Sequence, residues 1–244
     1  MRPHLDLALT VGKDLQRPDL NEDAFVCGDG ALRQAIADGA SESFDSKTWA
    51  NLLTEKFVRE GPPNVDWVFD AVGKYNRKFD VHTLSWSKAA AFERGSFSSL
   101  LGVTFDPESE LANVFGVGDS LCVHTLAGRV VASFPYTRPE QFDERPELLS
   151  TLKVANAFVA EPNFFDERSA VWRMTPDSVL LLMTDALGQW LLKELAETPS
   201  SLETLLKIHD YPSFELLVDE LRKTHRLRLD DTTIVRLSVD SAVP

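Results

Sequence analysis

The sequence has little of what several common kinds of site require. Its 244 residues include two cysteines, Cys27 and Cys122, which cannot by themselves form a disulfide framework or a zinc site. The five histidines are scattered, and neither an HExxH nor a GxSxG motif is present. We therefore expect both cysteines to be reduced thiols in the core. The sequence also offers no persuasive covalent nucleophile.

Basic residues and long apolar runs are scarce as well. The 25 lysines and arginines are outnumbered by 38 aspartates and glutamates, which gives a net charge of −13. Such a surface repels phosphate backbones and anionic lipids, so we expect no nucleic-acid or membrane partner. No apolar run approaches the roughly 20 residues of a transmembrane helix. The first residues carry Asp6 and lack the long apolar segment of a signal peptide, so we expect a cytoplasmic protein.

The hydropathy pattern changes between strand and helix periods along the chain. Alternating apolar residues from Leu5 to Val11 are typical of a half-buried strand. Strands are predicted at 4–11, 24–27 and 32–37, in four runs between 97 and 134, at 179–183 and at 232–239. Helices are predicted at 45–60, 67–79, 83–94, 187–196, 201–208 and 211–225, and 135–169 is proline-rich and irregular. We therefore predict one α+β domain over residues 1–244, with antiparallel sheets covered by helices.

Aspartates stand at the ends of three predicted strands. Asp38 follows one strand, Asp185 follows another, and Asp230 and Asp231 precede the last. In an antiparallel sheet the end of one strand lies beside the start of its neighbour, so these side chains are predicted to gather on one rim. Acidic residues are also common turn formers, and any one of these acids alone is better explained as a turn residue than as a metal ligand.

Further carboxylates follow the same pattern. Glu22 and Asp23 begin the second predicted strand, and Asp119 follows a Gly-Val-Gly turn. Clustered carboxylates repel one another unless a cation compensates, so the group implies a metal ion or raised pKa values. Ligands that are all oxygen favour Mg²⁺, Mn²⁺ or Ca²⁺ over Zn²⁺.

Five short motifs around these acids occur in an informative order. They are NEDAF at 21–25, AIADGASE at 35–42, GVGDS at 116–120, TPDSVLLLMTDAL at 175–187 and DDTTIV at 230–235. Taken in order they resemble the metal-dependent protein phosphatase family, the type 2C Ser/Thr protein phosphatases, in particular its compact bacterial members. The resemblance covers nearly the whole chain. It implies a four-layer α-β-β-α sandwich of two antiparallel sheets flanked by helices.

The resemblance also implies roles for individual residues at a first metal ion. Asp38 matches the aspartate that bridges two divalent ions, and Gly39 matches the glycine whose carbonyl binds one of them. Asp185 and Asp230 match the residues that complete the shell of the first ion.

Three further acids match residues around the other ions. Glu22 matches an outer ligand of the second ion, and Asp23 matches its supporting neighbour. Asp119 matches a carboxylate that helps to hold a third, weaker ion in bacterial members.

The activity implied by the resemblance is hydrolysis of phosphoserine and phosphothreonine in proteins. A hydroxide that bridges two Mg²⁺ or Mn²⁺ ions would attack phosphorus in line. The implied partners are a phosphorylated protein substrate and a cognate Ser/Thr kinase, and we expect a monomer.

The sequence also departs from the family pattern. The usual DGxGG is DGASE here, with Ala40, Ser41 and Glu42 in place of a flexible turn, and the late motif reads TDAL. The position of the phosphate-binding arginine is held by Pro18, so Arg17 is the candidate clamp, with Arg33 and Arg94 as competitors. The TxDH segment appears as YTRPEQF.

These departures keep two alternatives open. One is a catalytically weak or inactive phosphatase-like module that binds and regulates a phosphoprotein or a kinase. The other is a scaffold protein whose carboxylate rim holds a structural ion.

Overall fold

Two five-stranded antiparallel sheets form the centre of the computed structural model, which describes residues 1–41, 43–198 and 200–240. The first sheet has the order β1 (Arg2–Val11), β12 (Thr232–Asp240), β11 (Ser178–Met183), β7 (Leu121–Leu126) and β8 (Arg129–Phe134). The second has the order β10 (Ser169–Arg173), β6 (Leu111–Val117), β5 (Leu100–Asp106), β3 (Arg33–Ala37) and β2 (Ala24–Cys27). A short pair, β4 (Phe97–Ser98) and β9 (Leu149–Ser150), forms a separate two-stranded sheet.

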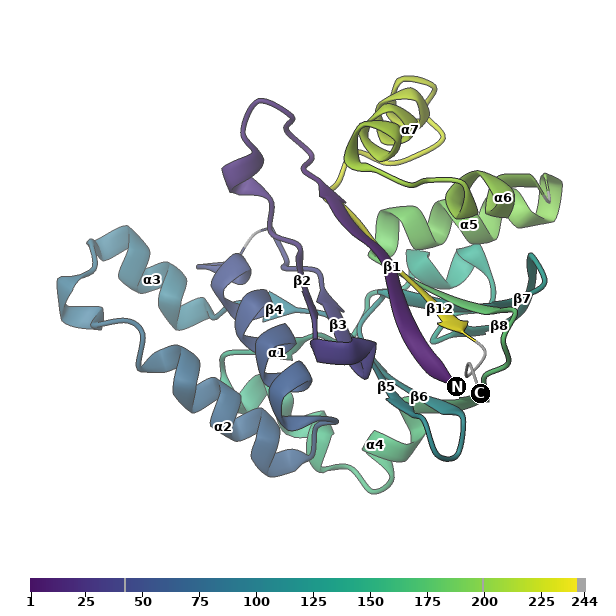
Figure 1. The fold of residues 1–244 in the computed structure, drawn as a ribbon. Helices are drawn as coiled ribbons and strands as arrows, with labels where there is room; N and C mark the ends of the chain where they lie inside the picture. Colours follow the sequence, from purple (N-terminus) through teal and green to yellow (C-terminus); the bar gives the residue numbers. More distant parts are fainter. Residues whose placement is uncertain (42, 199, 241–244) are drawn as a thin grey trace.

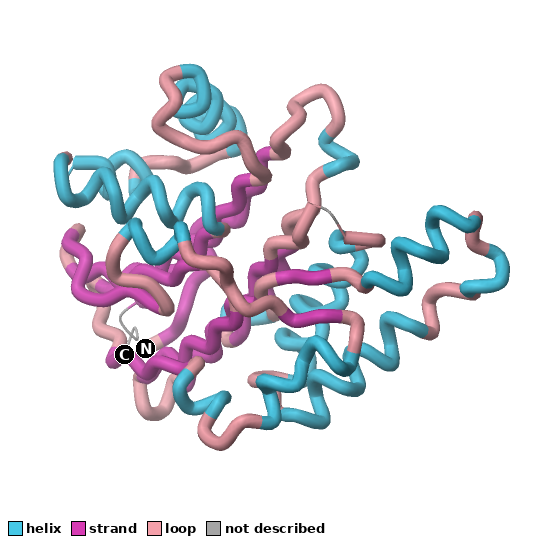
Figure 2. The backbone as a smooth tube through the Cα atoms, turned by 180° about the vertical axis from the view of Figure 1, so that it is seen from behind, coloured by secondary structure: helices cyan, strands magenta, loops and turns pink. Residues whose placement is uncertain are grey.

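Helices cover the outer faces of the two sheets (Figures 1 and 2). The second sheet is covered by α1 (Ser46–Glu60) and α2 (Val65–Asn76), and the first by α5 (Asp185–Glu197), α6 (Ser200–Leu206) and α7 (Tyr211–Lys223). Apolar side chains of the two inner faces, among them Ile36, Leu101, Leu182 and Val235, form the core between the sheets. The structure confirms the predicted four-layer α-β-β-α arrangement.

Local sequence explains where α1 begins and ends. The side chain of Asp45 accepts a hydrogen bond from the backbone N–H of Thr48 and caps α1. Trp49, Leu53 and Phe57 recur at helical spacing and are fully buried against the second sheet. Gly61, with a φ of 89°, ends the helix in a conformation that favours glycine.

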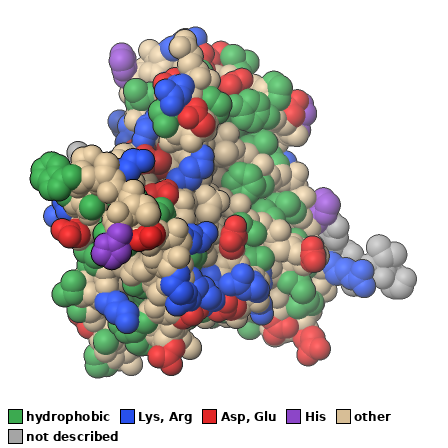
Figure 3. Space-filling model, turned by 90° about the vertical axis from the view of Figure 1, so that its left-hand side faces the viewer, with side chains coloured by type: hydrophobic (Ala, Val, Ile, Leu, Met, Phe, Trp, Pro, Cys, Tyr) green, Lys and Arg blue, Asp and Glu red, His purple; other side chains and the backbone are tan. Residues whose placement is uncertain are grey.

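The connecting segments are less regular. Helix α3 (Trp86–Arg94) projects from the body of the molecule, on the side whose surface mixes basic, acidic and apolar side chains (Figures 1 and 3). The remaining pieces are α4 (Phe164–Glu167) and 3₁₀ turns at Pro18–Leu20, Asp29–Ala31, Val81–Thr83, Pro139–Asp143 and Lys153–Ala160. Among the described residues, no helix combines the length and apolar character needed to span a bilayer. Strand β10 lies in a stretch where the sequence predicted no element.

Candidate metal centre

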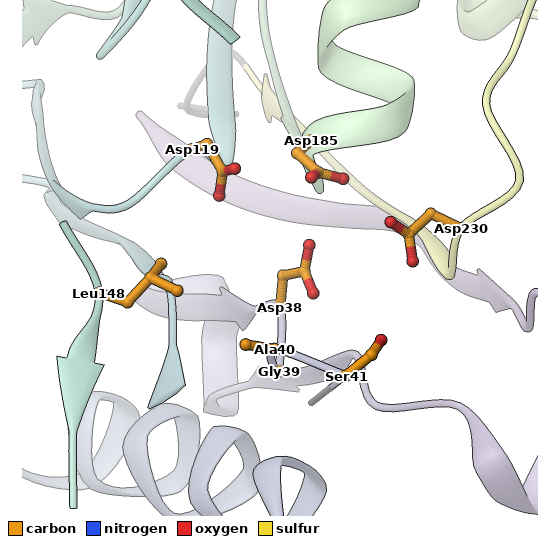
Figure 4. A pocket seen from close by; sticks show the side chains of 8 residues that line it. All are labelled: Asp38, Gly39, Ala40, Ser41, Asp119, Leu148, Asp185 and Asp230. Atoms are coloured by element: carbon orange, nitrogen blue, oxygen red, sulfur yellow. The ribbon is translucent and has the colours of Figure 1, made fainter. Parts of the chain in front are cut away.

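Four aspartates converge on one cavity between the sheets (Figure 4). Asp38 follows β3, Asp119 lies between β6 and β7, Asp185 is the first residue of α5, and Asp230 precedes β12. The cavity has a volume of about 140 Å³. Carboxylate oxygens of Asp38, Asp119 and Asp185 lie within 4.8 Å of one another. The strand-end aspartates therefore share one rim.

The remaining wall of the cavity is formed by short side chains and one leucine. Gly39, Ala40, Ser41 and Leu148 line it together with the aspartates. A Cβ atom on Gly39 would lie 2.9 Å from the Glu22 carbonyl oxygen and 2.8 Å from the Cβ of Ser46. Glycine at this position lets the end of β3 approach the Glu22 backbone closely.

Serines hold two of the acidic turns together. The backbone N–H of Asp38 donates to Ser99 Oγ at 2.9 Å, and the Ser99 and Ser120 hydroxyl oxygens are 2.8 Å apart. The Asp38 carbonyl accepts a hydrogen bond from Ser98 Oγ at 2.8 Å. These serines were not predicted, although Ser98 and Ser99 form a serine pair directly before a strand.

Asp23 lies behind the rim and does not line the cavity. Its Oδ2 accepts hydrogen bonds from Thr233 Oγ1 at 2.6 Å and Thr184 Oγ1 at 3.0 Å. Burial, together with the charges of Asp231 and Asp230, raises the pKa of Asp23 to about 7, although these hydroxyl donors act in the opposite direction. This position suits a residue that supports the centre from behind.

Asp231 is buried and fixes the loop that connects β1 to β2. Its two carboxylate oxygens accept hydrogen bonds from the backbone N–H groups of Lys13, at 2.7 Å, and Glu22, at 2.8 Å. The DDTTIV motif thus anchors the NEDAF motif through hydrogen bonds. The sequence did not predict this contact.

Glu22 lies beside the cavity, on the wall of an adjoining groove. It accepts hydrogen bonds from Ser46 Oγ at 2.5 Å and Lys13 Nζ at 2.8 Å. Lys13 Nζ also donates to Ser41 Oγ at 2.7 Å, which places a positive charge at the edge of the cavity. Burial alone would raise the pKa of Glu22, but the hydrogen bonds from Lys13 and Ser46 outweigh it and lower the pKa.

The assembled carboxylates are poorly compensated. Burial and the charges of Asp23, Asp119 and Asp230 raise the pKa of Asp38 well above its usual range. Burial likewise raises the pKa of Asp119. Asp185 Oδ1 is buried and has no hydrogen-bond partner among the described residues. The site therefore favours a cation.

One arginine reaches this group. Arg228 contacts the carboxylate of Asp185, and its Nε lies 3.7 Å from Oδ2 of Asp230. Arg228 lies five residues beyond α7, in a stretch of the sequence that is rich in basic residues.

The arginines predicted as phosphate clamps lie elsewhere. Arg17 is exposed and pairs with Asp19 at 3.2 Å, and it does not line the cavity. Arg33 donates to the carbonyl oxygens of Val58 and Arg59 at the end of α1. Arg94 lines a neighbouring groove instead. Glu42, the third altered residue of the DGASE turn, lies outside the described residues.

Of the comparisons with known proteins, the one with solved structures identifies the fold. No protein-family model and no curated protein sequence matches the chain. Among solved structures, the Mycobacterium tuberculosis serine/threonine phosphatase PstP/Ppp has a TM-score of 0.62 at 16% identity, over 99% of this chain and 100% of that chain.

Two further solved structures give the same result. The catalytic domain of PstP in complex with two manganese ions has a TM-score of 0.60 at 15% identity, over 98% of this chain and 99% of that chain. Staphylococcus aureus Stp1 has a TM-score of 0.56 at 14% identity, over 96% and 95%. At these identities the likeness shows the fold, two antiparallel sheets flanked by helices.

Proposed function

We propose that this chain, which has the type 2C phosphatase fold, is a divalent-metal-dependent phosphatase that hydrolyses phosphoserine and phosphothreonine in proteins. The observation that carries the proposal is the convergence of Asp38, Asp119, Asp185 and Asp230 on one cavity. The similarity to serine/threonine phosphatases supports the same reaction. A cognate Ser/Thr kinase would supply the phosphorylated partner.

The donor set suits Mg²⁺ or Mn²⁺. The four aspartates offer only carboxylate oxygens as ligands, and hard divalent ions prefer oxygen ligands. The raised pKa of Asp38 and the unpartnered Oδ1 of Asp185 both reflect a need for positive charge. Asp38 would bind two ions, and the Gly39 carbonyl would bind one of them. Asp185 and Asp230 would complete the shell of the first ion.

Two more acids complete the proposed shell. Glu22 would contribute from the adjoining groove, supported by Asp23, and Asp119 would hold a third ion. When bound, such ions offset the charge of the phosphoryl group and lower the pKa of the attacking water. The chain itself supplies Lys13 at the rim, where its ammonium group would orient a phosphoryl oxygen.

Hydrolysis of p-nitrophenyl phosphate and a phosphothreonine peptide tests the proposal, with Mn²⁺, Mg²⁺ or EDTA present. We expect turnover that needs the metal and that falls by roughly a hundredfold or more in Asp38→Asn and Asp185→Asn. Asp177→Asn is the matched control, because Asp177 is exposed and lies outside the cavity. Folded, metal-loaded protein that hydrolyses neither substrate would refute the enzyme assignment.

The second candidate function is a phosphatase-like module that binds a phosphoprotein without hydrolysing it. The contact of Arg228 with Asp185 favours it, because a guanidinium already compensates part of the acidic cluster. Phosphopeptide binding that persists in EDTA, with no turnover in any metal, would identify this function.

A further inference from the structure

A second groove opens beside the carboxylate cavity. Its volume is about 540 Å³, and it shares Ala40 and Leu148 with the cavity. The cavity itself, at about 140 Å³, is well below the roughly 300 Å³ of the smaller ligand pockets. A phosphorylated side chain can enter it, but the peptide that carries this side chain must lie outside, along an adjoining surface.

The charge of this groove is opposite to that of the molecule. Arg94 and Arg145 line it in a chain whose net charge is −13. The acid that also lines it, Glu147, is paired with Arg168. Arg94 donates to the carbonyl of Ala90, at the end of its own helix. Among the described residues, Arg145 has no ion-pair partner, so its charge is available to a ligand.

Most of the remaining lining of the groove is apolar. Phe97 comes from β4 and Phe158 from the 3₁₀ turn at 153–160, and both are partly buried. Leu148 connects this apolar surface to the edge of the cavity. A peptide in the groove would therefore bury apolar atoms while its side chains reach the arginines.

A groove on the opposite edge of the cavity is less suited to an acidic peptide. It shares Ser41 with the cavity and is lined by both acids and lysines. Its three acids, Asp19, Glu22 and Asp45, outnumber its two lysines, so this groove has no excess of positive charge. Electrostatic complementarity therefore favours the groove that Arg94 and Arg145 line.

We propose that the groove formed by Arg94, Phe97, Arg145, Leu148 and Phe158, called here the arginine groove, binds the peptide that flanks the phosphorylated residue. Arg94 and Arg145 select substrates with an anionic side chain, a carboxylate or a second phosphate, close to that residue. This inference rests on the proposed function, because it takes the carboxylate cavity as the place where the phosphoryl group binds.

Phosphothreonine peptides that differ at one position test the selection. Glutamate is placed two, three or four residues before or after the phosphothreonine, and glutamine replaces it in the matched peptide. A third peptide of each set carries phosphoserine there, which separates a carboxylate from a second phosphate. We expect at least one position at which the anionic peptide has about tenfold higher kcat/KM than its glutamine partner.

The variants assign that preference to the groove. In the double variant Arg94→Gln/Arg145→Gln we expect the ratio of the two kcat/KM values to fall to about one. Arg129→Gln, which changes an exposed arginine on β8, keeps the wild-type ratio. The preference should also weaken between 50 and 500 mM salt, as expected for exposed charges. Wild-type protein without any preference, or a preference that survives in the double variant, overturns the inference.

Binding separates failure of this inference from failure of the proposed function. Fluorescence anisotropy of the labelled phosphopeptides with Mn²⁺-loaded protein needs no turnover. If neither p-nitrophenyl phosphate nor the phosphothreonine peptide is hydrolysed, the enzyme proposal fails, and the anisotropy ratio of glutamate and glutamine peptides still decides on the groove. Equal affinities for both peptides refute the arginine groove whether or not the protein is an enzyme.

Discussion

At the scale of single residues, Lys13 and Arg17 are the two candidates for binding the phosphoryl group. Lys13 lies at the edge of the cavity, hydrogen-bonded to Glu22 and Ser41, whereas Arg17 pairs with Asp19 on the surface. If Lys13 orients the phosphoryl group, Lys13→Met lowers kcat/KM by about tenfold or more, since hydrogen bonds to charged groups contribute about 1.5–3 kcal/mol. Lys13→Arg should restore part of this loss.

Arg17→Met tests the alternative, in which Arg17 binds the phosphoryl group. Steady-state hydrolysis of a phosphothreonine peptide measures all three variants at a single Mn²⁺ concentration. A loss confined to Arg17→Met would establish the arginine as the clamp and remove Lys13 from this role.

Gly39 gives a second prediction for a single residue. An added Cβ would overlap Ser46 and the Glu22 carbonyl, so Gly39→Ala should lower the free energy of unfolding by about 1–3 kcal/mol. Gly73→Ala is the control, because Gly73 lies inside α2 and its Cβ would meet only the flexible end of Arg77. Urea denaturation measures both, and an unchanged midpoint for Gly39→Ala would show that the two segments can separate.

The acids of the site were predictable from the sequence, but its cations were not. Asp185 and Asp230 stand at facing ends of the paired strands β11 and β12, so strand direction brings these two to one rim. Asp38 comes from the other sheet and joins them because the two sheets pack face to face. The positions of Lys13 and Arg228 depend on loop conformation. Loops have no periodicity from which the direction of a side chain follows.

At the scale of elements, the contact between α1 and α2 depends on a buried ammonium group. The side chain of Lys56 is 2% exposed, donates to Glu60 and Asp70, and lies 5.0 Å from the centre of the Trp67 ring. Hydrogen bonds from Lys56, which is the largest contributor, and from Arg59 and Lys74 lower the pKa of Glu60 to about 2. Those from Lys56 and Lys74 lower the pKa of Asp70 to about 2.

This arrangement predicts a particular pH dependence of stability. Because both folded-state pKa values lie below the ordinary values of 4.5 and 3.8, the stabilisation is complete above about pH 5 and is lost as the pH falls towards 2. Urea denaturation at pH 6, 4 and 3 should therefore show a difference between wild type and Lys56→Met that shrinks with falling pH. Lys78→Met, an exposed lysine, is the control, and a constant difference would contradict the assignment.

Elements were predicted where their apolar period was long. The helices α1, α5 and α7 and the strands β1, β7, β11 and β12 have clear patterns, and the structure places them where they were expected. Strand β10 was missed because it is a five-residue edge strand that, among the described residues, pairs with β6 alone and remains half exposed. Its formation depends on β6, which lies more than 50 residues earlier.

At the scale of the whole molecule, repulsion at the site opposes folding until cations bind. The raised pKa of Asp38 means that folding without a cation disfavours its ionised form. Asp38 lies between segments from both sheets, so the repulsion acts across the interface of the sandwich (Figure 4). An ion that relieves it should stabilise both sheets together.

Thermal denaturation of metal-free protein titrated with Mn²⁺ measures this coupling. An ion that binds the folded state alone contributes about 2.7 kcal/mol at one hundred times its Kd, which raises Tm by about 5–10 °C in a chain of this length. Asp38→Asn should show two opposite effects: metal-free protein at least as stable as wild type, because the repulsion is gone, and little gain with Mn²⁺. Asp177→Asn should keep the full gain. A wild-type Tm that does not respond to millimolar Mn²⁺ would mean that Arg228 already neutralises the cluster, and the non-catalytic module would become the better description.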